Sequence, residues 1–256
     1  MRVPLSPALL SVPLTHRGYH DFAARRPENS LSAFEAAAQA GYAIELDVEL
    51  TRDGQAMVFH DDTLDRMTAE TGPLQDRTAA ELGRITLNHS DDRIPTLAQV
   101  LDRVAGRVPL LIEIKDRWDT MGVTSGLLEK ATAEALSGYS GDVAVMSFNP
   151  NCMAEFTRLA PHLPRGLTTD YYDPADNEML PPEVCARLRE IPDFERTASS
   201  FISHKHSDLW QPRVAELKAQ GAAILCWTVR SPEQEALARK VAHNITFEGY
   251  PAPFPA

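Results

Sequence analysis

Along almost its whole length of 256 residues, the chain alternates between two kinds of segment. Short β-rich apolar runs are each followed by an amphipathic stretch rich in alanine and leucine. This alternation predicts a parallel sheet, because parallel neighbours need a crossover connection, which is usually a helix. We expect strands at Ser11–Thr15, Ala43–Leu50, Val108–Lys115, Val143–Ser147, Arg165–Thr169, Phe201–Ser203, Ala223–Thr228 and Asn244–Phe247.

Helices are expected between these strands. Ser30 and Gly41 flank the first helical pattern, and Ser231-Pro232 opens the last, as start and stop signals do. Eight strands in about 250 residues predict the α/β class and a closed (β/α)8 TIM barrel, with a doubly wound open sheet as the alternative. The expected helices are Leu31–Ala40, Thr124–Leu136, Asn151–Leu159, Pro182–Arg189, Pro212–Gln220 and Pro232–Val241.

One segment interrupts the alternation after the second strand. Asp53-Gly54 predicts a hairpin turn into a short strand at Ala56–His60. The residues that follow are loop-like, with one short helix near Ala79–Leu82. We therefore expect a single domain over residues 1–256 with a small insertion at about 51–95, on the side where barrel enzymes build their sites.

Charge and apolar length restrict the classes of partner. The 25 basic and 36 acidic residues give a formal net charge of −11, which disfavours binding to nucleic acid or to an anionic membrane surface. No apolar run approaches the ~20 residues that span a bilayer, so no stable membrane insertion is expected. Residues 1–16 are expected to lead into the first strand rather than to act as a secretory signal. The spacing of Cys152, Cys185 and Cys226 suits neither a disulfide framework nor a zinc site, and predicts buried thiols in a cytoplasmic protein.

Acidic residues gather on one face of the second predicted strand. Side chains alternate across a strand, so Glu45, Asp47 and Glu49 share one face while the apolar residues between them share the other. Inside a barrel these carboxylates would repel one another unless protons, basic partners or a cation neutralised them. On an edge strand facing water the same pattern would have no functional meaning.

The third long strand repeats the pattern. Alternation places Glu113 and Lys115 on one face at the carboxyl end of Val108–Lys115, where barrel active sites lie. Three carboxylates without cysteine or a histidine pair form a hard oxygen site, which suits Mg2+ or Ca2+ better than zinc or copper. The alternative reading of Glu113 and Lys115 is a structural ion pair.

Two histidines follow other strands. His16 begins His16-Arg17-Gly18, and His60 begins His60-Asp61-Asp62. Histidine titrates near neutrality, so one imidazole could donate a proton to a leaving oxygen while the other withdraws one. Arg17 offers a permanently charged fork for a phosphate. Taken singly, a histidine at a strand end is more often structural.

The order and spacing of several segments resemble the glycerophosphodiester phosphodiesterase family through nearly the whole chain. The resemblance implies a TIM barrel with a small insertion after the second strand and a divalent metal bound by acids. The segments that carry it are His16-Arg17-Gly18, Pro27-Glu28-Asn29-Ser30, Ile44-Glu45-Leu46-Asp47-Val48, Thr51-x-Asp53-Gly54, His60-Asp61-x-x-Leu64-x-Arg66-x-Thr68, Ile112-Glu113-Ile114-Lys115 and Trp227-Thr228-Val229.

The resemblance also implies roles at matching positions. Glu45, Asp47 and Glu113 would be ligands of Mg2+ or Ca2+, with Mn2+ as a further candidate. His16 and His60 would be the acid and base, in an order that the sequence does not assign. The groups implied to hold the substrate are Arg17 and Lys115 on the phosphate oxygens and Trp227 on the glycerol side, where a core aromatic is the alternative reading.

Three features depart from the family pattern. Eight residues, Tyr19 to Arg26, separate the first two segments, slightly more than the family pattern leads us to expect, and bring His20, Arg25 and Arg26, which we expect to be solvated. Arg230 stands where the family often has asparagine, and Glu248 lies in Phe247-Glu248-Gly249-Tyr250-Pro251, which replaces the usual Thr-Asp-x-Pro. Asp61, Glu49 and Lys205 are candidates of lower rank.

The expected activity is metal-dependent hydrolysis of small glycerophosphodiesters, such as glycerophosphocholine or glycerophosphoethanolamine, to sn-glycerol 3-phosphate and an alcohol. The nucleophile is either the free glycerol hydroxyl of the substrate, through a cyclic phosphate, or water. The alternatives are a lysophospholipase D-like or cyclising phosphodiesterase acting on lysolipids, and a non-enzymatic barrel that binds a phosphate ester. The sequence leaves the alcohol, the resident metal and the oligomeric state open.

Overall fold

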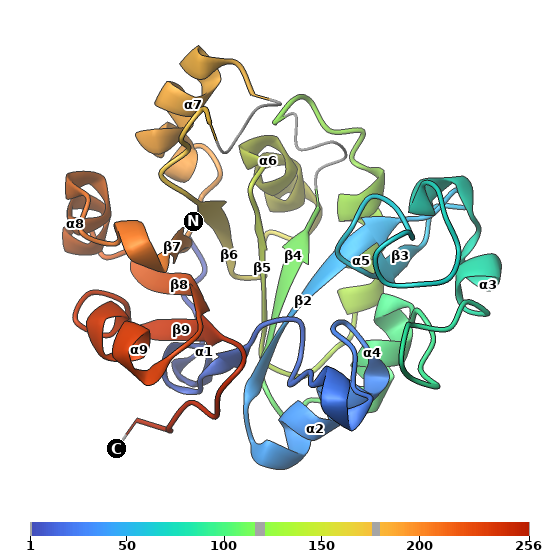
Figure 1. The fold of residues 1–256 in the computed structure, drawn as a ribbon. Coiled ribbons are helices and arrows are strands. Elements are labelled where there is room, and N and C mark those ends of the chain that lie inside the picture. The colour runs from blue at the N-terminus through green and yellow to red at the C-terminus, as the bar shows by residue number, and fades with distance from the viewer. Residues whose placement is uncertain (1, 116–120, 176–179, 256) are drawn as a thin grey trace.

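Eight parallel strands close into a barrel in a computed structural model that describes residues 2–115, 121–175 and 180–255. The strands follow the order β1-β9-β8-β7-β6-β5-β4-β2, and β1 pairs with β2 as well as with β9, which closes the ring (Figure 1). The predicted (β/α)8 barrel is confirmed. The barrel strands are β1 (Leu14–Thr15), β2 (Ala43–Leu50), β4 (Leu110–Ile114), β5 (Val143–Ser147), β6 (Arg165–Thr169), β7 (Phe201–Lys205), β8 (Ala223–Val229) and β9 (Asn244–Phe247).

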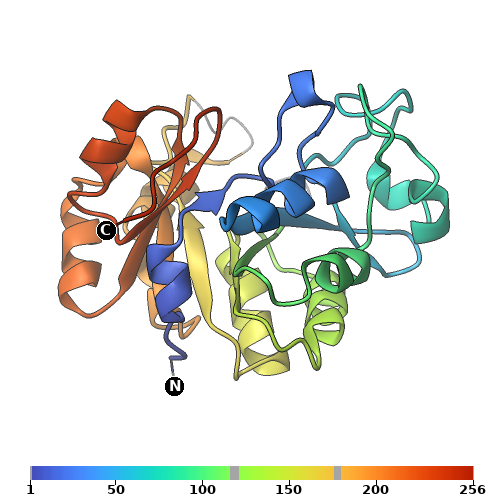
Figure 2. The same cartoon turned by 90° about the horizontal axis from the view of Figure 1, so that it is seen from below.

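Helices surround the barrel strands and provide the crossovers between them (Figures 1 and 2). The predicted boundary signals act as expected, since Ser30 caps the first crossover helix through the amide of Ala33 and Gly41 ends it at φ +79°. The crossover helices are α2 (Leu31–Ala40), α4 (Leu97–Val104), α5 (Leu127–Leu136), α6 (Pro150–Leu159), α7 (Pro182–Arg189), α8 (Pro212–Ala219) and α9 (Pro232–Ala238).

Alternation along the strands divides the apolar residues between two cores. Ile44, Leu46 and Val48 point outward into the large core beneath the helices. Ala43, on the other face of β2, joins the cluster that fills the amino-terminal end of the barrel. The acids of β2 share this inward face, so they point into the barrel toward its carboxyl-terminal end, as their alternation predicts.

The first strand is shorter than predicted, because only the last two residues of Ser11–Thr15 form it. Residues Pro7–Ser11 form a short helix, α1, and only Leu14–Thr15 pair as a strand. The side chain of Ser6 caps the amide of Leu9, and Pro7 occupies the first helical turn, where a proline is well tolerated. The buried Leu9 packs with the inward residues of the barrel and closes its amino-terminal end.

Some helix and strand boundaries differ from the predicted ones by a few residues. The helix α5 begins at Leu127 rather than Thr124, because Gly126 precedes it with φ +76°. Strand β7 continues to Lys205, two residues beyond the prediction, and β8 continues to Val229.

The segment between β2 and α4 lies outside the barrel, on the opposite side from α8 and α9 (Figures 1 and 2). Strand β3 (Ala56–Val58) pairs antiparallel with β2 through the predicted Asp53-Gly54 hairpin. Helix α3 (Ala79–Leu82) matches its predicted bounds, and the segment has a small apolar core of its own. That residues 1–256 form one domain stays a prediction. No helix in the described parts of the chain has the length and apolar character needed to cross a membrane.

Candidate active site

One cavity opens at the carboxyl-terminal end of the barrel, where the chain leaves the strands. It collects all eight site residues predicted from the sequence, from segments that are far apart in sequence. The cavity is lined by His16, Arg17, Glu45, Asp47, His60, Glu113, Lys115, Met146, Phe148, Trp227 and Thr246.

Three carboxylates form the acidic side of this cavity. Asp47 of β2 and Glu113 of β4 are register partners on adjacent parallel strands, and Glu45 precedes Asp47 on the same inward face. Each offers a carboxylate oxygen, and the three oxygens lie within 4.8 Å of one another. All three side chains are buried, with at most 6% of the residue surface exposed. The set could hold one hard divalent cation, because such ions take clustered carboxylate oxygens at about 2.0–2.6 Å.

The charge of this cluster is unevenly compensated. Burial raises the pKa of Glu45 well above its usual range, and the two neighbouring carboxylates raise it further. Asp47 is equally enclosed, but three basic side chains outweigh burial and lower its pKa to about 2. These are His60, Lys115 and Arg17. Glu45 therefore has too little positive charge around it, and a divalent cation would supply that charge, which supports the fit of a metal to this site.

Arg17 reaches the cluster because the chain turns sharply after β1. Its backbone lies in the left-handed region at φ +56°, and its amide donates to the Glu45 carboxylate over 2.9 Å. Gly18 follows at φ +82°, where a Cβ would lie 2.9 Å from the Phe34 ring, so only glycine fits. The Arg17 guanidinium donates to Glu28 over 2.8 Å and lies 3.6 Å from Asp47.

Lys115 supplies the second basic side chain beside the three carboxylates. Its ammonium lies 3.1 Å from Glu113 and 3.8 Å from Asp47. The predicted ion pair between Glu113 and Lys115 is therefore present, and it is part of the cavity wall rather than an alternative to it.

The two histidines are each held by a carboxylate. The Nδ1 atom of His16 contacts Oε2 of Glu248, and the Nδ1 atom of His60 lies 2.7 Å from Oδ1 of Asp61. A carboxylate accepts a hydrogen bond from the N–H at Nδ1, which leaves Nε2 as the nitrogen of the neutral imidazole that carries no proton. Burial lowers the pKa of His16, although the hydrogen bond with Glu248 opposes this effect.

A chain of ion pairs links the second histidine to Arg17. Asp61 accepts two hydrogen bonds from Arg66, which in turn donates two to Glu28, the partner of Arg17. The segments containing Glu28 and Arg66 carried the family resemblance, but the sequence assigned neither residue a role. Asp61, a candidate of lower rank, orients His60.

Two further supporting residues were missed. Asn29 donates to Asp47 over 2.9 Å, and its own amide donates to the carbonyl of Arg17. Glu248 was noted only as a departure from the family pattern. Its contact with His16 spans 232 residues and depends on the closure of the barrel, so no local signal could have identified it.

The opposite wall of the cavity is aromatic. Trp227 packs edge-on against Phe148 with ring centroids 5.4 Å apart, and its indole N–H donates to the carbonyl of Ser203. Lys205 does not line the cavity, and its ammonium instead pairs with Asp170 and lies over the ring of Tyr171.

The other minor candidates divide between buried and exposed positions. Glu49 is buried, and burial raises its pKa to about 8. His20 is largely buried beside Glu248, so the expectation that it is solvated is wrong. Arg25 is exposed and pairs with the exposed Asp91, as expected. Arg26 is partly buried beside Asp21, so it too is less solvated than expected.

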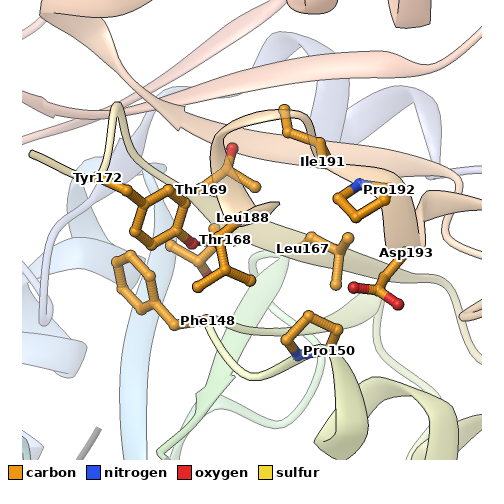
Figure 3. A pocket seen from close by; sticks show the side chains of 10 residues that line it. All are labelled: Phe148, Pro150, Leu167, Thr168, Thr169, Tyr172, Leu188, Ile191, Pro192 and Asp193. Carbon is orange, nitrogen blue, oxygen red and sulfur yellow. Dashed lines mark hydrogen bonds between the residues drawn. The ribbon is translucent and has the colours of Figure 1, made fainter. Parts of the chain in front are cut away.

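A second, smaller cavity lies beside the first and shares Phe148 with it. Figure 3 shows the rings of Phe148 and Tyr172 near one another, with Leu167 and Ile191 among the apolar lining. Of the ten residues drawn there, only Asp193 is charged, and two arginines pair with it. We therefore assign this cavity to the packing of β6 against α7 and the turn that follows it.

Comparisons with known proteins agree with this geometry. A sequence profile described as the glycerophosphoryl diester phosphodiesterase family matches residues 16–244. The putative glycerophosphodiester phosphodiesterase YhdW of Bacillus subtilis is 28% identical over 93% of this chain and 94% of its own length. A glycerophosphodiester phosphodiesterase of Bacillus altitudinis is 36% identical over 60% of this chain and 64% of its own length.

Solved structures share the fold. An Oleispira antarctica phosphodiesterase in complex with the product sn-glycerol-3-phosphate superposes with a TM-score of 0.73, at 23% identity over 92% of this chain and 93% of that one. A putative glycerophosphoryl diester phosphodiesterase from Agrobacterium tumefaciens gives a TM-score of 0.75 at 22% identity, covering 93% of both chains. Since the profile spans most of the chain, the protein belongs to the glycerophosphoryl diester phosphodiesterase family of enzymes.

Proposed function

We propose that this enzyme hydrolyses small glycerophosphodiesters to sn-glycerol 3-phosphate and an alcohol, with glycerophosphocholine and glycerophosphoethanolamine as the first substrates to test. The observation that carries the proposal is the convergence of three carboxylates, two carboxylate-held imidazoles and two basic side chains, Arg17 and Lys115, in one cavity. The sn-glycerol-3-phosphate in the Oleispira structure supports a small-molecule substrate of this class.

Glu45, Asp47 and Glu113 would hold a divalent metal, Mg2+, Ca2+ or Mn2+. When bound, such an ion supplies positive charge that stabilises the phosphoryl oxygens in the transition state. Arg17 and Lys115, which lie beside the same carboxylates, would neutralise the phosphoryl oxygens as well and orient the diester.

The two imidazoles transfer protons through Nε2. One takes the proton of the nucleophile, and the other gives a proton to the alkoxide that leaves. The nucleophile is either the free glycerol hydroxyl, which yields a cyclic phosphate that is then hydrolysed, or water. Trp227 and Phe148 form the apolar wall against which the glycerol backbone packs.

The test is a panel of glycerophosphodiesters assayed with Mg2+, Mn2+ and Ca2+, following released glycerol phosphate. Phosphorus NMR of the products separates full hydrolysis from release of a cyclic phosphate, and a lysolipid arm tests the lysophospholipase D-like alternative. If folded, metal-loaded enzyme cleaves none of the small diesters, the proposed substrate class is wrong.

We also propose a cytoplasmic location. The three cysteines are buried and form no disulfide, which suits a reducing compartment.

A further inference from the structure

Glu248 is the meeting point of three basic side chains from two segments that are far apart in sequence. Its Oε2 atom contacts Nδ1 of His16 and lies 3.6 Å from Nε2 of His20, both in the segment after β1. Its Oε1 atom accepts a hydrogen bond of 2.7 Å from Arg230, which directly follows β8. Glu248 itself follows β9, so the cluster ties together the exits of three adjacent strands.

The two oxygens of Glu248 have different partners, and this fixes the plane of the carboxylate. Arg230 holds one oxygen from the solvent side, where 57% of its side chain is exposed. His16 takes the other oxygen from the cavity side, where only 14% of its side chain is exposed. A carboxylate held at both ends has little freedom to rotate, so it also restrains the imidazole bound to it.

The same arrangement occurs independently at the second histidine. There Asp61 accepts from His60 and from the guanidinium of Arg66, with distances of 2.7 Å to both. The two sets share an imidazole, a carboxylate and a guanidinium in the same order, yet they come from unrelated segments. Arg66 and Arg230 therefore occupy equivalent places relative to the two imidazoles of the cavity.

The cluster also coincides with the features that depart from the family pattern. Arg230 and Glu248 are two separate departures in sequence, and in the structure they contact each other. The long segment after Gly18 brings the third partner, His20.

We propose that Glu248, held in place by Arg230, is a positioning residue that fixes His16 with the proton on Nδ1 and Nε2 free to act in the cavity. The proposal rests on the proposed function and assigns the group that prepares one of its two imidazoles. The charged groups that face His16 are Glu248, Arg17 and Asp47. Contacts with His16 and His20 keep Glu248 ionised, because they outweigh its burial and hold its pKa well below the usual range.

The experiment compares Glu248→Gln, Glu248→Asp and a control, Glu35→Gln. Glu35 also accepts two hydrogen bonds from an arginine, Arg107, but on the outer surface between α2 and the end of α4. We expect Glu248→Gln to lower kcat by about 10- to 100-fold with KM changed less than about threefold. Glu248→Asp, which keeps the charge, should recover part of the loss, and the control should match the wild type.

Nitrogen-15 NMR of the imidazoles gives a readout that does not need activity. In the wild type, His16 should carry its neutral-state proton on Nδ1, and Glu248→Gln should convert it to a mixture of tautomers while the His60 signals stay in place. Wild-type kcat in Glu248→Gln, or an unchanged His16 tautomer, would overturn the proposal. If the wild type cleaves no substrate but the tautomer change is seen, the positioning role stands and the proposed function fails.

A double-mutant cycle tests the part played by Arg230. Arg230→Met alone should lower kcat by roughly three- to tenfold, whereas in the Glu248→Gln background it should have little further effect, because the two residues act as one unit. Independent, multiplicative losses in kcat would show that Arg230 does not act through Glu248.

Discussion

The acidic cluster predicts opposite effects for two isosteric changes, Glu45→Gln and Asp47→Asn. Without metal, Glu45 is the carboxylate least compensated by its surroundings, since burial and its neighbours raise its pKa. Asp47 is the best compensated, with a pKa of about 2. Glu45→Gln therefore removes repulsion between carboxylates, whereas Asp47→Asn removes negative charge that stabilises Arg17 and Lys115.

The magnitude follows from the geometry. Two like charges 4.8 Å apart repel by about 3.5 kcal/mol at an effective dielectric constant near 20. Because burial and the neighbouring carboxylates raise the pKa of Glu45, its charged form is disfavoured, and Glu45→Gln should leave the free energy of unfolding of the metal-free protein within about 1 kcal/mol of wild type, or above it. Asp47→Asn should lower it by about 1–3 kcal/mol, because a buried group loses paired partners.

With metal bound, Glu45→Gln should become less stable than wild type. At a hundredfold excess over Kd, a ligand that binds only the native state adds about 2.7 kcal/mol, or about 5–10 °C in Tm for a chain of this size. Glu45→Gln should lose most of this increment, because one ligand is gone.

Thermal melts after chelation measure the stability of the metal-free variants, and melts after addition of Mg2+, Mn2+ or Ca2+ measure the stabilisation by metal. A Glu45→Gln variant that melts well below wild type without metal, yet gains the full increment with it, would refute the reasoning, as would a wild-type Tm insensitive to all three ions.

Three further predictions concern the same cavity and its approach. His16→Ala and His60→Ala should each lower kcat by about 100- to 10,000-fold in a diester assay, with unchanged far-ultraviolet circular dichroism; wild-type activity in both would contradict the acid–base roles. Metal binding should release protons and tighten as pH rises, because a metal ion needs Glu45 ionised and the metal-free folded state raises the pKa of that carboxyl. Calorimetry in buffers of different ionisation enthalpy measures the proton release, and proton uptake would contradict the prediction. Gly18→Ala should lower the urea midpoint, by about 2 kcal/mol or more in unfolding free energy, since it adds a Cβ at φ +82° against Phe34, and no change would show that this turn can relax.

The barrel and its inward acids could be predicted because the relevant signals are local. Alternation within Ala43–Leu50 places Glu45 and Asp47 on one face whatever the rest of the chain does, and the strand matches its predicted bounds. Parallel pairing then sets Glu113 beside Asp47. The resemblance supplied what alternation could not, namely that the histidines belong with these acids.

What escaped prediction depends on contacts between distant segments or on competing local signals. The first strand was predicted to begin at Ser11, but Ser11 ends the short helix Pro7–Ser11, which the side chain of Ser6 caps. Arg66 and Glu248 were not assigned roles, because a charged residue on a loop acquires one only when folding supplies its partner. His20 was expected to be solvated for the same reason.

The pairing of β1 with both β2 and β9 has a consequence for synthesis on the ribosome. All three acids of the cluster and both imidazoles precede residue 116, so they leave the exit tunnel long before β9 is made. Until that strand arrives, β1 keeps an unpaired edge and His16 lacks its carboxylate. A nascent chain would therefore hold nearly every functional side chain and still be inert, and catalytic competence should appear abruptly when the ring closes.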